Sequence, residues 1–435
     1  MPYRLATPQW RAGDSGKFTE CGWTQPVSSS IKWAAVGCAA VFVPAAAGLP
    51  YPPLVLGPGT ADVAARILQV SFDRMTELPR PRDDLAGFPA YRTQQLAADV
   101  RVQANEWAEP NPAARWLTTE ELRDVLLNRY PSGQTAAALR AALAKEYGVE
   151  PDQLILGNGS NELLLSTFLV FGGAGRTTLL FQPTYSMHAR LTVIAGGTVA
   201  EEQIGLPYEV GADQALAAME RVRPDIVVIT SPNNPTGNVV PDEVTLAIAR
   251  TYPTTLVLLD EAYSDFAGSS LVSAIAKHPN IVISKTFSKV RAAAGLRLGV
   301  LVAHPELAEI YRAAQLPYSI SAITLAVGLK MVRSDTDLAA RVERCRVERE
   351  RVAAALGRIP SLTVHPSVTN FLLVRIHDGD TAGVHARFLR EGVLIRDISM
   401  WPGCAGCVRI SIGTHEENDR IIAALASVFG SKAVA

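Results

Sequence analysis

Three segments in the middle of the chain carry its most specific pattern: SPNNPTG (231–237), LLDEAYSDF (258–266) and SKTFSKVRAAAGLR (284–297). In the second segment, Asp260 ends an apolar run, where a carboxylate is costly unless it meets a cation. In the first segment, the proline after Asn234 forces an extended backbone, so the Asn amide is presented where a strand ends. The third segment contributes two lysines. Together they predict a ligand site at the ends of neighbouring strands.

Apolar runs and helical patterns alternate through the middle of the chain. TLLF (178–181), DIVVIT (225–230) and LVLLD (256–260) are near-continuous apolar runs, as in strands covered on both faces. Helical patterns such as DQALAAMERV (213–222) lie between them. This order predicts an α/β fold with a mostly parallel central sheet. Closer to the C-terminus, a long charged helical pattern (337–357) followed by short strands predicts a smaller α+β lobe.

A phosphate site is predicted in GNGSNELLL (157–165), where small residues precede a helical pattern. Free backbone N–H groups and the helix dipole attract an anion at such a position. The segment lacks the third glycine of a dinucleotide fingerprint, so a Rossmann-type site is disfavoured. The candidate phosphate donors are Gly159, Ser160 and Asn161, with hydroxyls from Thr286 and Ser288.

Aromatic and cationic side chains are the remaining candidates for ligand binding. Tyr185, in PTYSMH, follows a predicted strand and would place its ring against a planar ligand, although an ordinary core tyrosine is the alternative. Arg396 in LIRD and Arg409 in CVRISIG carry guanidinium forks that pair with carboxylate or phosphate. Surface ion pairing is the alternative, and it is harder to dismiss for Arg396. The two arginines predict an anionic substrate.

The bulk properties of the chain exclude several classes of protein. With 435 residues, the chain exceeds one ordinary domain, and we expect two lobes plus a terminal segment. The net charge is −1 and Lys and Arg are spread along the chain, so we expect no nucleic-acid partner. Five cysteines, an odd number, fit a reducing compartment, and we expect a cytoplasmic protein.

Two further patterns are assigned no function. The run 33–49 is apolar but short, and Pro44 interrupts it, so we expect a buried or poorly ordered extension and no membrane partner. Cys404 and Cys407 form a CxxC pattern, but no second pair or His cluster supplies further ligands. We therefore expect no metal.

Taken with LNRYPSGQ (127–134), VHPSVTNFLLVRI (364–376) and CVRISIGTHEEN (407–418), these motifs resemble the class I/II aminotransferases of fold type I. The likeness is greatest to the histidinol-phosphate aminotransferase branch, and it covers about residue 102 to the C-terminus. It implies pyridoxal 5′-phosphate as the cofactor. It also implies a homodimer with shared active sites and a small anionic amino substrate.

The resemblance also chooses between the two lysines. In this family a Ser precedes the lysine that forms the Schiff base, and an Arg that holds the phosphate follows eight positions later. Ser288 and Arg297 meet this rule for Lys289, whereas Lys285 would place an alanine at the Arg position. We therefore predict that Lys289 binds the cofactor covalently.

The remaining roles are likewise carried over from the resemblance. Asp260 would lie beneath the ring nitrogen and keep it protonated, so that the ring accepts electrons; a helix cap is the alternative for this residue taken alone. Asn234 and Tyr263 would donate to the phenolic oxygen. Tyr130 would reach the phosphate of the neighbouring subunit's cofactor, and Asn370 would lie near the substrate.

The resemblance divides the chain into four parts. Residues 1–95 are an extension of unknown role, 96–135 an N-terminal arm and part of the small lobe, 136–310 the large cofactor-binding domain, and 311–435 the small domain. Within the arm, ANEWAEPNP (104–112) replaces the Asn-Glu-Asn-Pro segment usual in the family. The lid over the substrate is therefore expected to differ.

The predicted reaction is transamination between an amino acid or amino phosphate and an oxo acid. The same cofactor and fold also support lyases, decarboxylases and enzymes that form new bonds, and the altered arm keeps that alternative open. A non-catalytic cofactor-binding regulator would need a basic DNA-binding domain before residue 90, and that stretch is not basic.

Overall fold

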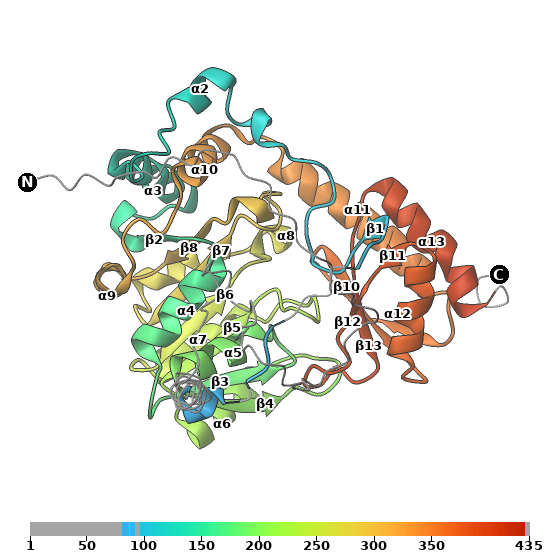
Figure 1. Ribbon diagram of the computed structural model, residues 1–435. Helices are drawn as coiled ribbons and strands as arrows, with labels where there is room; N and C mark the ends of the chain where they lie inside the picture. The colour runs from blue at the N-terminus through green and yellow to red at the C-terminus, as the bar shows by residue number, and fades with distance from the viewer. Residues whose placement is uncertain (1–80, 87, 92–95, 431–435) are drawn as a thin grey trace, which may run out of the picture. The chain divides into compact units, whose positions relative to one another are not determined.

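The computed structural model describes residues 81–86, 88–91 and 96–430, all within the unit Pro81–Ala435. The predictions for 33–49 and for most of 1–95 lie outside these described residues. Figure 1 shows two lobes within this unit, a larger one that ends near α10 and a smaller one that begins at α11.

The larger lobe is built on a seven-stranded sheet with the order β2-β8-β7-β6-β5-β3-β4. β8 alone runs opposite to the other six strands, because both of its pairings, with β2 and with β7, are antiparallel. The predicted mostly parallel α/β sheet is thus confirmed. The strands are β2 (Leu154–Gly157), β3 (Thr177–Gln182), β4 (Thr198–Gln203), β5 (Ile226–Thr230), β6 (Leu256–Asp260), β7 (Ile281–Thr286) and β8 (Gly299–Val302).

Helices cover both faces of this sheet because its strands are apolar on both sides. In β5, for example, Val227 and Ile229 pack into the core formed with α3, α6, α7 and α10, whereas Ile226 and Val228 pack against α4, α5 and α9. The helices are α3 (Gly133–Tyr147), α4 (Ser160–Phe171), α5 (Met187–Ala195), α6 (Ala212–Val222), α7 (Asp242–Thr251), α9 (Pro305–Ala314) and α10 (Ala322–Ser334). Short helices α2 (Thr119–Arg123) and α8 (Ser264–Ala267) lie in connections.

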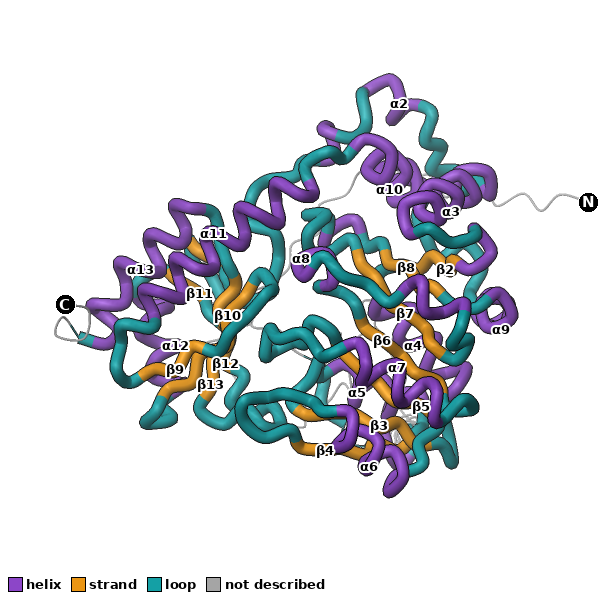
Figure 2. The backbone as a smooth tube through the Cα atoms, turned by 180° about the vertical axis from the view of Figure 1, so that it is seen from behind, coloured by secondary structure: helices purple, strands orange, loops and turns teal. Residues whose placement is uncertain are grey.

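The smaller lobe has an antiparallel sheet with the order β12-β13-β10-β9 and a parallel pair, β1 with β11. Helices α11, α12 and α13 form one core with a single face of the four-stranded sheet (Figure 2). The elements are β1 (Val100–Arg101), β9 (Leu362–Val364), β10 (Phe371–Ile376), β11 (Val393–Leu394), β12 (Arg396–Asp397), β13 (Cys407–Ser411), α11 (Leu338–Leu356), α12 (Thr381–Arg390) and α13 (His415–Phe429). The N-terminal arm therefore contributes a strand to this lobe.

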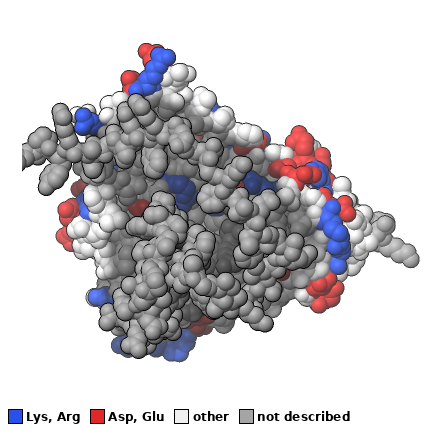
Figure 3. Space-filling model, viewed as in Figure 1, with Lys and Arg blue, Asp and Glu red and all other residues white. Residues whose placement is uncertain are grey.

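Charges of both signs occupy the described part of the surface. Figure 3 shows Lys and Arg side chains beside Asp and Glu side chains on the α11 side, where Arg346 pairs with Glu343 and Glu350. Within the described residues, no helix has the length and apolar character needed to cross a bilayer. The same residues contain no group of three or more His, Cys, Asp and Glu side chains that could hold a metal ion.

Candidate active site

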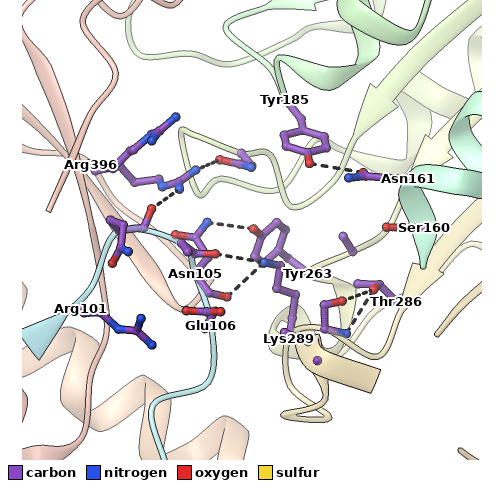
Figure 4. A pocket seen from close by; sticks show the side chains of 18 of the residues that line it. Arg101, Asn105, Glu106, Ser160, Asn161, Tyr185, Tyr263, Thr286, Lys289 and Arg396 are labelled. Atoms are coloured by element: carbon purple, nitrogen blue, oxygen red, sulfur yellow. Dashed lines mark hydrogen bonds between the residues drawn. The ribbon is translucent and has the colours of Figure 1, made fainter. Parts of the chain in front are cut away.

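A cavity of about 1120 Å³ lies where the carboxyl ends of β5, β6 and β7 meet the small lobe (Figure 4). Clefts at the carboxyl ends of parallel strands are the usual ligand sites of such sheets. All the predicted site residues line this cavity except Gly159, Tyr130 and Asn370. The fold therefore brings together side chains that are far apart in the sequence.

Lys289 is the lysine that reaches the cavity. It lies in the loop after β7, and its Nζ donates to the backbone oxygens of Asn105 at 3.1 Å and Ala104 at 3.5 Å. Lys285, on β7 itself, instead makes a buried ion pair with Glu261 at 2.7 Å. Of the two candidates, only Lys289 can meet a ligand there.

One end of the cavity is rich in donors suited to a phosphate. Ser160 and Asn161 open helix α4, and Thr286 Oγ1 donates to Ser288 Oγ at 3.0 Å. Arg297 Nη1 lies 3.5 Å from the same Ser288 oxygen. These are backbone, hydroxyl and guanidinium donors at a helix N-terminus, the arrangement that favours an anion.

Gly159 immediately precedes α4 and lies outside the cavity lining, next to Arg297. Its backbone adopts φ 83° and ψ 159°, a conformation that is essentially limited to glycine. A Cβ atom at this position would collide with the guanidinium of Arg297. Glycine at 159 therefore allows Arg297 to lie against the start of α4.

Asp260 lies at the end of β6 and is almost fully buried. Its Oδ1 accepts from the Ala262 N–H at 3.1 Å, and its Oδ2 lies 3.1 Å from Nε2 of His188. An ionised carboxylate only accepts hydrogen bonds, and toward such a carboxylate His188 would donate through Nε2. The sequence analysis did not identify His188, although the residue belongs to the quoted PTYSMH motif.

Arg409 is placed by the alternation of strand β13. Val408 and Ile410 pack on the helices of the small lobe, so Arg409 projects from the opposite face. Its Nη1 donates to Asn234 Oδ1 at 2.6 Å, and its Nη2 donates to the Gln103 carbonyl at 3.0 Å. Burial lowers the pKa of Arg409 below its usual value.

The N-terminal arm supplies residues that the sequence analysis missed. Asn105 Nδ2 donates to the Tyr263 hydroxyl at 2.9 Å, and its Oδ1 accepts from Ser411 Oγ at 2.9 Å. Asn105 lies in the altered 104–112 segment, which was the one sequence signal for it.

Tyr185, predicted to pack against a planar ligand, lines the cavity, and its hydroxyl donates to Asn161 Oδ1 at 3.3 Å.

Arg396 lies beside Arg409, because the two residues are register partners in β12 and β13. Figure 4 shows Arg396 and Arg101 on the small-lobe side of the cavity, across from Lys289, Thr286 and Asn161. Arg101, on β1, was not identified in the sequence. Together with Arg409, this places three guanidinium groups in the cavity lining, where Asp99 and Glu106 also lie.

Asn370 and Tyr130 lie outside the cavity wall. Asn370 is buried behind Asn105 and donates to its carbonyl at 3.1 Å, so it contacts the arm. Tyr130 is 76% exposed and stacks on Tyr318 with ring centroids 4.3 Å apart. In its own chain, Tyr130 is not part of the cavity.

Comparisons with known proteins agree with this arrangement. Residues 95–425 match the family described as aminotransferase class I and II. The histidinol-phosphate aminotransferase of Corynebacterium glutamicum is 39% identical over 373 residues, which cover 81% of this chain and 97% of that protein. That of Thermobifida fusca is 38% identical over 350 residues, which cover 77% and 92%.

Solved structures share the fold. The histidinol-phosphate aminotransferase of Sinorhizobium meliloti, in complex with pyridoxal-5′-phosphate, superposes with a TM-score of 0.73 at 23% identity, covering 82% of this chain and 100% of that one. The L-threonine-O-3-phosphate decarboxylase of Porphyromonas gingivalis superposes with a TM-score of 0.66 at 23% identity, covering 75% and 98%. The fold is thus common to two reactions. The match over residues 95–425 and the 38–39% identity to family members show that this chain belongs to the class I and II aminotransferases, enzymes that depend on pyridoxal phosphate.

Proposed function

We propose that this enzyme transfers the amino group between histidinol phosphate and a 2-oxo acid. The observation that carries the proposal is the pair Arg396 and Arg409, side by side on one wall of the cavity. Guanidinium groups pair with both carboxylate and phosphate, as an enzyme needs when a phosphate ester and an oxo acid use the same site. The relatives named above, at 38–39% identity, support histidinol phosphate as the amino substrate.

The donor set of the cavity fits pyridoxal phosphate at both ends. Thr286, Ser288 and Arg297, with the start of α4, would hold the phosphate. Asp260, already held by a backbone N–H and by His188, would face the ring nitrogen. A carboxylate at this position would stabilise a protonated ring nitrogen.

Further residues would hold the two sides of the cofactor. Asn234 and Tyr263 line the cavity and would donate to the phenolic oxygen, and Tyr185 would pack its ring against the cofactor. Asn105 orients the Tyr263 hydroxyl through its 2.9 Å hydrogen bond. The arm thus helps to position a side chain that would hold the cofactor.

Pyridoxal phosphate, when bound, supplies an electron sink for the carbon that bears the substrate's amino group. Lys289 would anchor the cofactor and, once freed, its Nζ would remove the proton from that carbon. A positioned base of this kind typically contributes about 10²–10⁴-fold. Arg409, fixed by Asn234 and the Gln103 carbonyl, would orient the substrate anion for this proton transfer.

We further propose that the enzyme is a homodimer that assembles through the apolar patch, defined as Leu122, Leu126, Leu127, Tyr130, Leu316 and Tyr318. These residues are 50–79% exposed, Tyr130 stacks on Tyr318, and exposed apolar side chains of this kind favour an interface. In a dimer, Tyr130 would be directed to the neighbouring subunit's cofactor phosphate.

The free thiols of Cys345, Cys404 and Cys407 support a cytoplasmic location.

Steady-state kinetics test the substrate. We expect histidinol phosphate to react with a kcat/KM that exceeds that of unphosphorylated histidinol, because the latter leaves a cation of the cavity unpaired. Replacing Arg396 with Met should reduce this preference, while a dicarboxylic oxo acid is still accepted through Arg409. Equal kcat/KM for histidinol and its phosphate would exclude the proposed substrate.

A further inference from the structure

The loop that carries Lys289 contains a left-handed residue that is not glycine. We call residues 287–293 the lysine loop. Within it, the Ala292 N–H donates to the Lys289 carbonyl at 2.8 Å and the Ala293 N–H donates to the Phe287 carbonyl at 3.0 Å, so the loop closes on itself. Ala292 has φ 55°, a region that the Cβ of an L-residue disfavours. The surrounding structure must therefore hold this turn.

A buried ion pair holds the lysine loop from the large lobe. Arg291 is 3% exposed, and its guanidinium pairs with Glu146 near the end of α3 and lies 4.7 Å from the ring centroid of Phe287. A guanidinium at this depth needs its carboxylate partner, because an unpaired buried charge is strongly unfavourable. A change in the shape of the loop would separate Arg291 from Glu146, so the ion pair stabilises the observed loop conformation.

The N-terminal arm holds the same turn from the other side. Asn111 Nδ2 donates to the carbonyl of Ala292 at 2.9 Å. Its Oδ1 in turn accepts from the Trp116 indole N–H at 2.8 Å, which fixes the orientation of the amide. Both Asn111 and Glu146 lie outside the cavity lining.

We propose that Glu146 and Asn111 are positioning residues for Lys289. They act through the lysine loop. Glu146 fixes Arg291 through the ion pair, and the Asn111 amide fixes the carbonyl of Ala292. The left-handed turn at Ala292 then directs the Lys289 side chain to the cavity. This inference rests on the proposed role of Lys289 as the residue that binds the cofactor.

Hydrogen exchange in the cofactor-free protein tests the inference without any turnover. In Glu146→Gln and in Asn111→Ala, the amides of Ala292 and Ala293 should exchange about tenfold faster or more, because local opening becomes easier. Tyr311→Phe is the matched control: it removes one buried hydrogen bond, to Thr167 at 2.9 Å, in a part of the core remote from the loop. Its lysine-loop exchange should equal that of the wild type.

Kinetics and visible circular dichroism of the loaded enzyme give the second measurement. A displaced lysine should lower kcat about 10- to 100-fold. KM should change by less than about threefold, because the substrate arginines are untouched. The dichroic band of the bound cofactor should weaken in both variants and remain in Tyr311→Phe.

Ala292→Gly provides the specific rescue. Glycine adopts the left-handed conformation without penalty, so Glu146→Gln combined with Ala292→Gly should show exchange and kcat closer to the wild type than Glu146→Gln alone. Wild-type loop exchange in a folded Glu146→Gln, or no recovery in the double variant, would overturn the inference. If Glu146→Gln does not fold, wild-type exchange and kcat in Asn111→Ala would overturn it. Absence of amino transfer would refute the proposed function but leave the exchange result intact.

Discussion

Substitution of Gly159 by Ala should weaken cofactor binding and, separately, lower the stability of the fold. The new Cβ would collide with the guanidinium of Arg297, which is the free end of a flexible side chain and can move away. Loss of one hydrogen bond to a charged group costs about 1.5–3 kcal/mol. That loss corresponds to a rise in the cofactor Kd of roughly 10- to 160-fold.

The same substitution carries a separate backbone cost. Gly159 has φ 83° and ψ 159°, and an alanine there costs about 1–3 kcal/mol of unfolding free energy. Gly379→Ala is the matched control, because Gly379 also has a positive φ, 75°, but a Cβ there meets no atom within 4 Å. The control should lose stability without losing cofactor affinity.

The measurement is a cofactor titration of each cofactor-free protein, followed by absorbance, with urea unfolding of the same samples. The expected result is weaker binding in Gly159→Ala alone, with comparable losses of stability in both variants. An unchanged cofactor Kd in Gly159→Ala would refute the role of Arg297 at the phosphate end.

Three other perturbations have defined outcomes. His188→Leu removes a hydrogen-bond partner of the buried Asp260 carboxylate, so kcat should fall roughly 10- to 160-fold, as steady-state assays would show; an unchanged kcat would contradict the assigned pair. Burial alone would raise the pKa of Glu348, but Arg351, His415 and Asn418 hold it at about 2, below its ordinary value of 4.5, so the folded carboxylate binds protons more weakly than the unfolded one. Its stabilisation is therefore present above about pH 4.5 and lost as the pH falls toward 2, and Glu348→Gln should flatten that part of the pH profile of unfolding free energy. Leu127→Asp places a charge in the apolar patch and should give monomers in sedimentation experiments, whereas a persistent dimer would place the interface elsewhere.

The fold and one side of the site could be predicted from the sequence because local patterns determine them. Apolar runs in β5 and β6 are typical of buried parallel strands, and Asp260 follows directly from the end of such a run. The choice of Lys289 over Lys285 needed the family resemblance, since both lysines share one segment. The structure adds a physical reason: Lys285 is engaged by Glu261.

The other side of the site depends on contacts between distant residues. Asn105 meets Tyr263 and Ser411, partners 158 and 306 positions away, and no local pattern encodes such a pairing. His188 is similar, because it lies in α5 and its role depends on Asp260, which is 72 positions away at the end of β6. Asn370, which was predicted to lie near the substrate, donates its amide to the carbonyl of Asn105, a contact 265 positions away that no local pattern encodes.

The most direct test of the account is the visible spectrum of the loaded enzyme during each half of the reaction. Histidinol phosphate alone, without an acceptor, should convert the cofactor fully to its pyridoxamine form, and a 2-oxo acid should then restore the original spectrum. Lys289→Ala should do neither at a comparable rate. A product released with the cofactor spectrum returned unchanged, and with no amino group passed to the oxo acid, would contradict transamination and favour a lyase on this fold.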